Sequence, residues 1–203
     1  MDELGLFPLG LVLLPTERIP LHIFEERYKE LIAECIERGS EFGLVYADEQ
    51  GIRDVGTRAR VTEVLTRFED GRMNILVEGG DRFRLDELTD GQSYAIGTVS
   101  AVDDDDDAAE GAAIEEALRT FGVLREVTGS DVDAPDPETP GLSFALAAKV
   151  ELPPAQKLEL LRELSERRRM EMVQEILEEA VLTAQRVRRA ARRAATNGRV
   201  DLG

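Results

Sequence analysis

Two hydrophobic periods divide the chain. From residue 5 to residue 102, apolar residues come in short runs or alternate with polar ones, which is typical of β-strands. After the aspartates at 103–107, apolar residues recur every three or four positions, which is typical of helices. The first part therefore predicts five or six mostly antiparallel strands in a small twisted barrel or sandwich. The second part predicts helices at about 108–128, 141–150, 154–165 and 166–195.

The change of period at the aspartates predicts two units and an α+β fold class. Residues 1–105 are expected to hold the strands and one helix, and residues 108–203 to be helical with a basic C-terminal tail. The last helix is expected to pack along its first half and to project at its end. The basic tail is defined by arginines at positions 186, 188, 189, 192, 193 and 199.

Two glycine-containing stretches predict how the strands are connected. Asp70-Gly71 lies between two long apolar runs, which is a good hairpin signal. Gly79-Gly80 lies partway along the second run and predicts a bulge or sharp bend there.

The only helix expected in the first half runs from about Phe24 to Arg38. Gly39 is expected to end it. Phe24 and Tyr28 are one turn apart and are expected to begin its apolar stripe. The stripe continues with Leu31, Ile32, Cys35 and Ile36, which share one helical face.

The charge of the chain limits the classes of partner. The net charge is −17, with 25 acids against 11 bases in residues 1–107. An acidic body of this kind repels phosphates, so nucleic acid is an unfavoured partner, and only the arginine-rich tail would attract it. The chain has one cysteine, an acidic start and no apolar run long enough for a membrane span. These features predict a cytoplasmic protein without a membrane partner.

The residues needed for the common chemistries are mostly missing. A single histidine, His22, and a single cysteine, Cys35, exclude most zinc sites. No phosphate-binding G-x-x-x-x-G-K-[ST] motif occurs, and a calcium loop counted from Asp131 lacks its glycine and its last glutamate. Ser143 and Lys149 are candidates for a catalytic Ser–Lys dyad, but on a helix they would lie about 120° apart, on different faces. We therefore predict no catalytic residues, no metal and no cofactor.

Three blocks of the sequence carry a resemblance to a known family. They are "LFPLGLVLLPTERIPLHIFEERYKELI", "DVGTRARVTEV…DGRMNILVEGGDRFRL" and "SFALAAKVELPPAQKLELLREL". In this order they resemble the N-terminal, substrate-binding domain of Lon protease, and "PLHIFEERY" is most similar to the free-standing bacterial members. The resemblance covers about residues 4–180. It implies a PUA-like β-barrel with one inserted helix, followed by a C-terminal helical bundle with a long last helix.

The same resemblance implies a function in recognition. In full-length Lon the domain precedes an ATPase module and a Ser–Lys protease domain, and the motifs of both are missing from these 203 residues. We therefore expect a non-catalytic module that binds unfolded or exposed hydrophobic protein segments, as an adaptor for proteolysis or quality control. A protease is one expected partner, and a homo-oligomer is left open. The alternatives are a nucleic-acid-binding PUA-like protein and, less favoured, a peptidase.

The stretch "IPLHIFEERY" supplies the candidate binding residues. Pro20 biases Ile19 to an extended conformation, so a strand is expected to meet a helix here. The stretch resembles the strand-to-helix corner of the family, and a structural role is the first interpretation. The alternative is that the corner borders a groove between barrel and helices, where an apolar peptide segment would lie. Leu21, Phe24 and Tyr28 are the residues expected to contact a bound peptide, with Tyr28 assigned mainly to the core. His22 is expected to be structural or on the surface.

Overall fold

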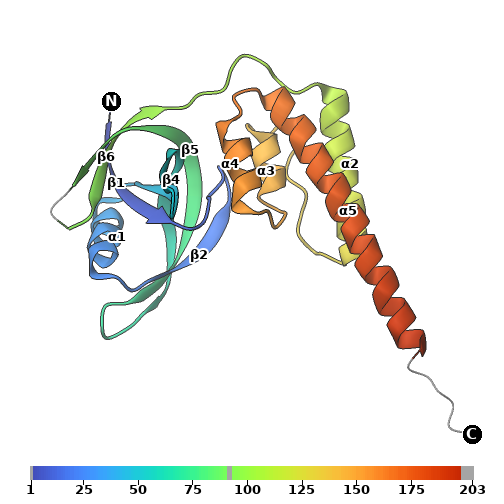
Figure 1. The fold of residues 1–203 in the computed structure, drawn as a ribbon, viewed down its shortest axis with the longest axis horizontal. Coiled ribbons are helices and arrows are strands. Elements are labelled where there is room, and N and C mark those ends of the chain that lie inside the picture. Colours follow the sequence, from blue (N-terminus) through green and yellow to red (C-terminus); the bar gives the residue numbers. More distant parts are fainter. Residues whose placement is uncertain (1, 91–92, 198–203) are drawn as a thin grey trace, which may run out of the picture.

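The computed structural model describes residues 2–90 and 93–197 and has two halves (Figure 1). Strands and one helix make up the sheet half, and four helices make up the helical half. In this described part the strands are β1 (Asp2–Leu9), β2 (Arg18–Ile23), β3 (Phe42–Asp48), β4 (Gly51–Arg67), β5 (Met73–Asp90) and β6 (Ala95–Ala101). The helices are α1 (Glu26–Arg38), α2 (Gly111–Thr128), α3 (Leu142–Ala147), α4 (Pro154–Arg162) and α5 (Glu166–Asn197).

The strands form a closed ring with one extra strand. Their order is β2-β5-β4-β3-β1-β6, and β5 also pairs with β6, which closes the ring. β1 is parallel to β3, and the other pairs are antiparallel. β2 lies outside the closure because it pairs only with the first part of β5, at residues 73–78. The fold is therefore α+β with a sheet ring that is not a regular barrel, and the PUA-like assignment stays a prediction.

Both glycine predictions are confirmed. The backbone N–H of Phe68 donates to the carbonyl of Arg72 at 2.9 Å, and Gly71 has a φ of 82°, so a tight hairpin turn joins β4 to β5. The β4–β5 register shifts between the pairs Thr57–Arg82 and Ala59–Gly79, which places a bulge beside the two glycines. A Cβ atom at Gly79 would lie 2.1 Å from the carbonyl oxygen of Leu14, so only glycine allows this close approach.

The predicted helix bounds were wrong at several ends. α1 begins at Glu26, with Glu25 extended, so Phe24 lies before the helix and does not belong to its stripe. The first helix of the second half begins at Gly111, because Glu110 is extended. α4 ends at Arg162, since Glu163 has extended backbone angles.

The segment after α4 is held by side-chain bonds. The Glu163 carboxylate accepts the backbone N–H groups of Leu164 and Ser165, each at 3.0 Å. These local bonds compete with the helical ladder. They give the chain a turn between α4 and α5 that hydrophobic periodicity alone does not reveal. Likewise, the helix predicted at 141–150 is reduced to Leu142–Ala147, after a left-handed Gly141.

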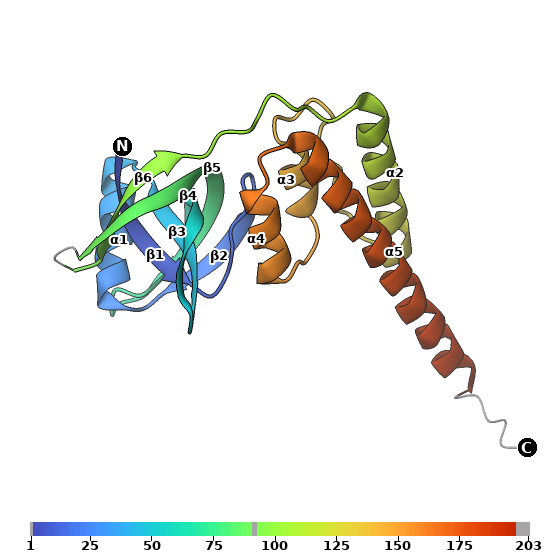
Figure 2. The ribbon, with the colours of Figure 1, turned by 45° about the horizontal axis from the view of Figure 1, so that its top comes forward.

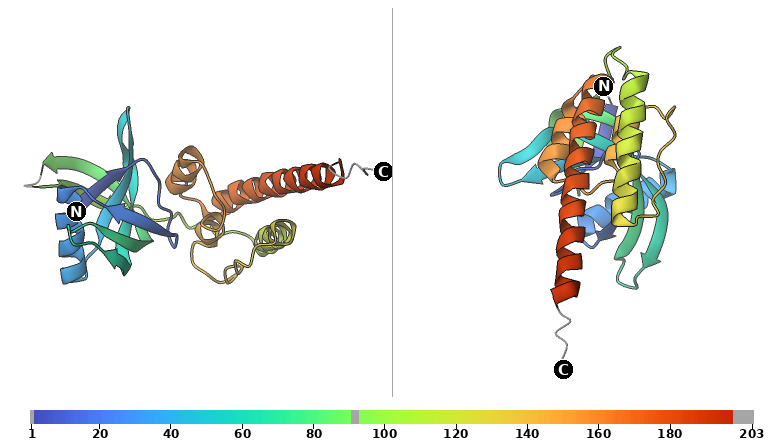
Figure 3. Two further views of the ribbon diagram at one scale, coloured as in Figure 1. Left: turned by 90° about the horizontal axis from the view of Figure 1, so that it is seen from below. Right: turned by 90° about the vertical axis from the view of Figure 1, so that its right-hand side faces the viewer.

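The last helix leaves the body of the protein. Figures 2 and 3 show α2 and α5 side by side, with the second part of α5 extending away from every other element. The buried residues of α5 are Arg169, Met170, Val173 and Leu177, and all four lie in its first half. This agrees with the predicted projection. Arg199 of the predicted tail lies outside the described residues, and the division into two domains stays a prediction.

The hydrophobic cores show how the halves meet. One core packs α1 against the sheet and includes the α1 residues Tyr28, Leu31, Ile32 and Cys35. A smaller core joins β1, β3, β5 and β6 through Leu4, Leu6, Val45, Phe83 and Val99. Another lies among the helices and takes in Val12, Leu14 and Val55 from the sheet half. The halves are thus joined by buried apolar contacts as well as by the linker at 102–110, which crosses between them (Figure 1).

Buried charges also join the two halves. Arg82 of β5 donates to the carbonyls of Leu161 at 2.9 Å and Glu163 at 2.8 Å, and it pairs with Asp104. Arg169 of α5 is fully buried and donates to Asp104 at 2.5 Å and to Glu166 at 2.5 Å. We call Arg82, Asp104, Glu166 and Arg169 the junction cluster. It ties strand, linker and helix together.

Candidate functional site

The predicted corner forms a small pocket beside an exposed ring. β2 ends at Ile23 and α1 begins at Glu26, so the two residues between them turn the chain. The pocket has a volume of about 230 Å³. Its lining residues are Phe7, Leu9, Pro20, Leu21, His22, Ile23, Phe24, Glu25 and Tyr28. Most of them are apolar, so the corner is suited to an apolar ligand group.

The three predicted residues have different exposures. Leu21 is 7% exposed and Tyr28 is 5% exposed, so both belong to the core that underlies the pocket. The Tyr28 ring packs on Phe7 with 4.1 Å between ring centroids. Burial raises the pKa of Tyr28, although Arg27, which stacks over the ring, acts in the opposite direction. Phe24, in contrast, is 59% exposed and lies on the surface.

Phe24 belongs to a surface group of rings that includes a residue the sequence did not reveal. The His22 ring stacks on the Phe24 ring with 5.9 Å between centroids. The rings of His22 and Phe68 are nearly perpendicular, with 6.1 Å between centroids. Phe68 is itself 38% exposed. We call His22, Phe24 and Phe68 the corner patch. A contiguous group of exposed rings of this kind is more informative than a single exposed apolar residue.

The pairing of β2 with β5 assembles the corner patch. His22 is opposite Asn74, and its Nδ1 lies 2.6 Å from the Asn74 side-chain oxygen. The β4–β5 turn then places Phe68 beside them, with the Arg72 guanidinium over its ring. Lys29 of α1 donates to the Asp70 carbonyl at 3.0 Å and holds this turn to the helix. The hairpin signal was the only clue to Phe68 in the sequence, because the contact between Phe68 and His22 depends on the register of the strands.

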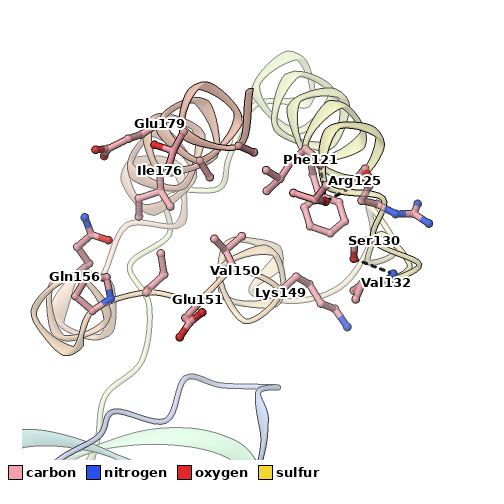
Figure 4. Close-up of a pocket in the computed structure, with 17 residues that line it drawn as sticks. Phe121, Arg125, Ser130, Val132, Lys149, Val150, Glu151, Gln156, Ile176 and Glu179 are labelled. Carbon is pink, nitrogen blue, oxygen red and sulfur yellow. Dashed lines mark hydrogen bonds between the residues drawn. The ribbon is translucent and has the colours of Figure 1, made fainter. Parts of the chain in front are cut away.

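A larger pocket lies among the helices (Figure 4). Its volume is about 620 Å³, and it lies between α2, α5 and the segment from α3 to α4. Phe121, Val150 and Ile176 point into it, and charged residues surround it (Figure 4). We call it the helix pocket. The sequence did not predict this pocket. Its lining residues come from different elements, and hydrophobic periodicity does not specify how those elements pack together.

The structure does not bring Ser143 and Lys149 together. Ser143 is buried, and its hydroxyl donates to Glu166 at 2.7 Å and accepts from Arg169 at 3.1 Å. Lys149 instead lines the helix pocket. Ser143 is therefore a structural part of the junction between the halves.

The other reactive side chains are placed in two environments. His22 is on the surface, as expected. Cys35 is buried, and burial raises the pKa of its thiol, which disfavours the reactive thiolate. Within residues 2–90 and 93–197, no three His, Cys, Asp or Glu side chains are grouped as metal ligands. Among the helices of this same part, none is both long and apolar enough to span a membrane.

Comparison with protein families gives one match over most of the chain. Residues 3–179 match the ATP-dependent protease La (LON) substrate-binding domain. A Lon protease of Paraburkholderia phytofirmans is 26% identical over 189 residues, which cover 85% of this chain and 24% of that protein. A Lon protease of Parabacteroides distasonis is 30% identical over 112 residues, covering 51% of this chain and 14% of that protein. The chain therefore spans less than a quarter of the length of these two relatives.

Solved structures give the same picture. A Lon N-terminal domain protein from Xanthomonas campestris is 28% identical, with a TM-score of 0.66, and the match covers 85% of this chain and 97% of that one. The N-terminal domain of Mycobacterium avium complex Lon protease is 17% identical, with a TM-score of 0.65, over 89% of this chain and 98% of that one. The second likeness concerns the fold alone. The family match covers the substrate-binding domain, not an ATPase or protease domain.

Proposed function

Because the chain belongs to the Lon substrate-binding domain family, we propose that it binds exposed hydrophobic segments of other proteins at the corner patch, with no catalytic step of its own. The observation that carries the proposal is the exposure of Phe24 beside His22 and Phe68. Three neighbouring rings on the surface of a strongly acidic protein have no role in its own core.

The corner patch combines an exposed contact and a preformed hollow. An apolar side chain of a bound segment would enter the 230 Å³ pocket, which Leu21, Phe24 and Tyr28 help to line. Burying an aromatic ring contributes about 2–3 kcal/mol, so a few such contacts are enough for weak, sequence-tolerant binding. Weak affinity suits the recognition of many unfolded proteins.

The charges beside the patch select among ligands. Glu25 and Glu26 lie next to Phe24, and each is engaged by a neighbouring base, Arg27 and Lys29 respectively. The whole body remains acidic, which disfavours acidic segments through long-range repulsion. We therefore expect neutral or basic apolar segments to bind best. In a bacterial cytoplasm such a module would act as an adaptor in quality control and present unfolded proteins to a separate protease.

Binding of fluorescein-labelled lysozyme that has been reduced and carboxamidomethylated, a basic unfolded protein, tests the proposal by fluorescence anisotropy. Phe24→Ala is expected to weaken binding about tenfold, as removal of a central aromatic contact often does. Val132→Ser is the matched control, because Val132 is 42% exposed and lines the helix pocket. Unchanged affinity in a folded Phe24→Ala protein would contradict the corner as the site. Weakening by Val132→Ser alone would assign binding to the helix pocket.

The absence of catalysis is tested separately. Casein and ATP should both remain intact on prolonged incubation with the protein. Turnover that Ser143→Ala or His22→Ala abolishes would contradict a purely binding role. A pull-down from the native cytoplasm, compared between the unaltered chain and Phe24→Ala, would identify both clients and any protease partner.

Nucleic acid binding is the second candidate function, and the exposed arginines of α5 favour it. Arg186, Arg188, Arg189 and Arg193 all lie on the projecting part of the helix. Affinity for a single-stranded RNA that falls steeply with salt would support this reading. The acidic sheet half disfavours it, since phosphates approaching that half are repelled.

A further inference from the structure

The solvent face of α5 has an ordered charge pattern. After Arg168, which pairs with Glu163, three acids come first, one exposed leucine follows, and three arginines come last. The residues are Glu171, Glu175, Glu178, Leu182, Arg186, Arg189 and Arg193, and all of them are exposed. Leu182 is 53% exposed, whereas Met170, Val173 and Leu177 on the opposite side of the helix are buried.

These seven residues share one face. They are spaced three or four positions apart, and at about 100° per residue they fall within an arc of about 80°. The arc lies roughly opposite Val173 and Leu177, which are fully buried against the rest of the protein. The face therefore points away from the body along its whole length, and Figure 3 shows α5 as an outer element of the helical half.

The face is available for contacts outside the chain. Among the side chains that the structure describes, Glu175, Arg186, Arg189 and Arg193 take part in no ion pair. Glu178 accepts a hydrogen bond from Gln174 at 2.7 Å, and this bond leaves the second oxygen of its carboxylate open. Only Glu171 already has a cation, Arg167, at 3.2 Å.

We propose that this face pairs antiparallel with the same face of a second copy, about a two-fold axis at Leu182. Around that axis Arg186 meets Glu178 of the second copy, Arg189 meets Glu175, and Arg193 meets Glu171. Each contact occurs twice by symmetry, and the two leucines meet at the centre. The body of each copy lies on the far side of its own α5, so the two bodies do not collide.

The order of the charges selects both the partner and its direction. A parallel pairing would place glutamates against glutamates and arginines against arginines, which is unfavourable. An antiparallel copy of the same helix is complementary at the six charged positions from Glu171 to Arg193, because the pattern changes sign about Leu182. A partner with a uniformly acidic or basic helix would match only half of the face.

The contact is expected to be weak and sensitive to salt. Exposed ion pairs contribute little each, and salt screens them. Leu182 is the one large apolar residue at the centre of the face. The protein should therefore exchange between monomer and dimer, with dimer favoured at high protein concentration and low ionic strength.

Sedimentation equilibrium of the full chain, at low and at high salt, tests the pairing. Glu175→Arg and Arg189→Glu should each raise the dimer dissociation constant at least tenfold, since each places like charges together twice. The double variant restores both pairs in inverted order, and it should return the constant to within about threefold of the unaltered chain. Arg188→Glu is the control, because Arg188 lies about 120° from the centre of the face.

Circular dichroism and melting temperature show that each variant is folded. A chain that stays monomeric at low salt up to millimolar concentration would overturn the proposal. So would a double variant as weak as the singles, or an Arg188→Glu variant as weak as Arg189→Glu.

Discussion

Two regions of the molecule depart from the usual placement of side chains. The junction cluster buries charged side chains, whereas the corner patch exposes aromatic ones. At the junction, Arg169 is fully buried and Arg82 is 5% exposed. At the corner, Phe24 is 59% exposed. Charged groups are usually at the surface and aromatic groups inside, so the cost of each exception has to be explained.

The explanations differ in kind. Every cation at the junction is compensated within the chain: Arg169 has two carboxylates, a carbonyl, the Ser143 hydroxyl and the face of Phe144 as partners. At the corner patch His22 contacts Asn74 and Arg72 lies over Phe68, but most of the Phe24 ring remains exposed to solvent. A region satisfied from within serves structure, whereas a region left unsatisfied is free to serve binding. Variants of the two regions should therefore behave differently.

The largest expected effect is at the junction. Replacing Arg169 with methionine keeps much of its volume but leaves Asp104 and Glu166 without their shared cation. Removing one partner of a buried ion pair typically costs about 3–5 kcal/mol. We expect a loss near the lower end, because the Asp104 side chain is about one third exposed and keeps Arg82. Urea denaturation measures the change.

The neighbouring Arg168 provides the matched control. Its side chain is 65% exposed, and it pairs with Glu163 at 3.3 Å. Arg168→Met should therefore change the unfolding free energy by less than about 1 kcal/mol. Equal effects of the two substitutions would mean that the junction cluster does not join the halves.

A smaller but sharper contrast lies within the corner itself. Tyr28→Ala removes a buried ring that packs on Phe7, and we expect a loss of about 3–5 kcal/mol in unfolding free energy. Phe24→Ala removes an exposed ring and should cost less than about 1 kcal/mol. Thermal melts combined with the affinity for the labelled unfolded protein separate the two roles. Comparable destabilisation by both would place Phe24 in the core and remove the argument for a binding surface.

The smallest expected effect concerns acid. Hydrogen bonds from Arg162 lower the pKa of Asp54, and those from Arg167 and Ser165 lower the pKa of Asp107. A carboxylate whose folded pKa is lowered stabilises the protein fully above its unfolded pKa of about 3.9. This stabilisation is lost as the pH falls through the lower folded value, so the links near the junction should weaken below about pH 4.

Asparagine variants isolate that contribution. Asp54→Asn and Asp107→Asn should lose less stability than the unaltered chain as the pH falls from about 4 to 2, as measured by urea denaturation at each pH. Asp106→Asn is the control, because Asp106 is an exposed neighbour in the same aspartate run. An identical pH dependence in all four proteins would contradict the pairing of Asp54 with Arg162 across the halves.

Much of the fold could be predicted from local sequence patterns, because turns, bulges and helical stripes depend on residues that are close together in the chain. The Asp70-Gly71 turn, the bulge at Gly79 and the buried stripe of α1 all follow from backbone conformation or periodicity. The errors fall where longer-range or side-chain effects decide. The Glu163 carboxylate ends α4 by binding two backbone groups, and hydrophobic spacing carries no trace of it.

The candidate site was predictable only in part. "IPLHIFEERY" identified the corner, and Tyr28 was rightly assigned to the core. Phe24 was misplaced in the helical stripe, because its four-residue spacing from Tyr28 resembled a helical turn. Phe68 was missed, since its approach to His22 depends on the register of β2 on β5 and on the length of the hairpin. No single stretch of sequence encodes such an approach.

The position of β1 has a consequence for how the chain folds. β1 lies between β3 and β6, and Leu4 of the first strand pairs with Gly97 of the last. During synthesis one edge of β1 must therefore stay unpaired until β6 has left the ribosome. Contacts between residues so far apart in sequence slow folding, and an open apolar strand edge favours aggregation in the meantime. A protein for which we propose the binding of exposed apolar segments thus displays such a segment of its own while it is being made.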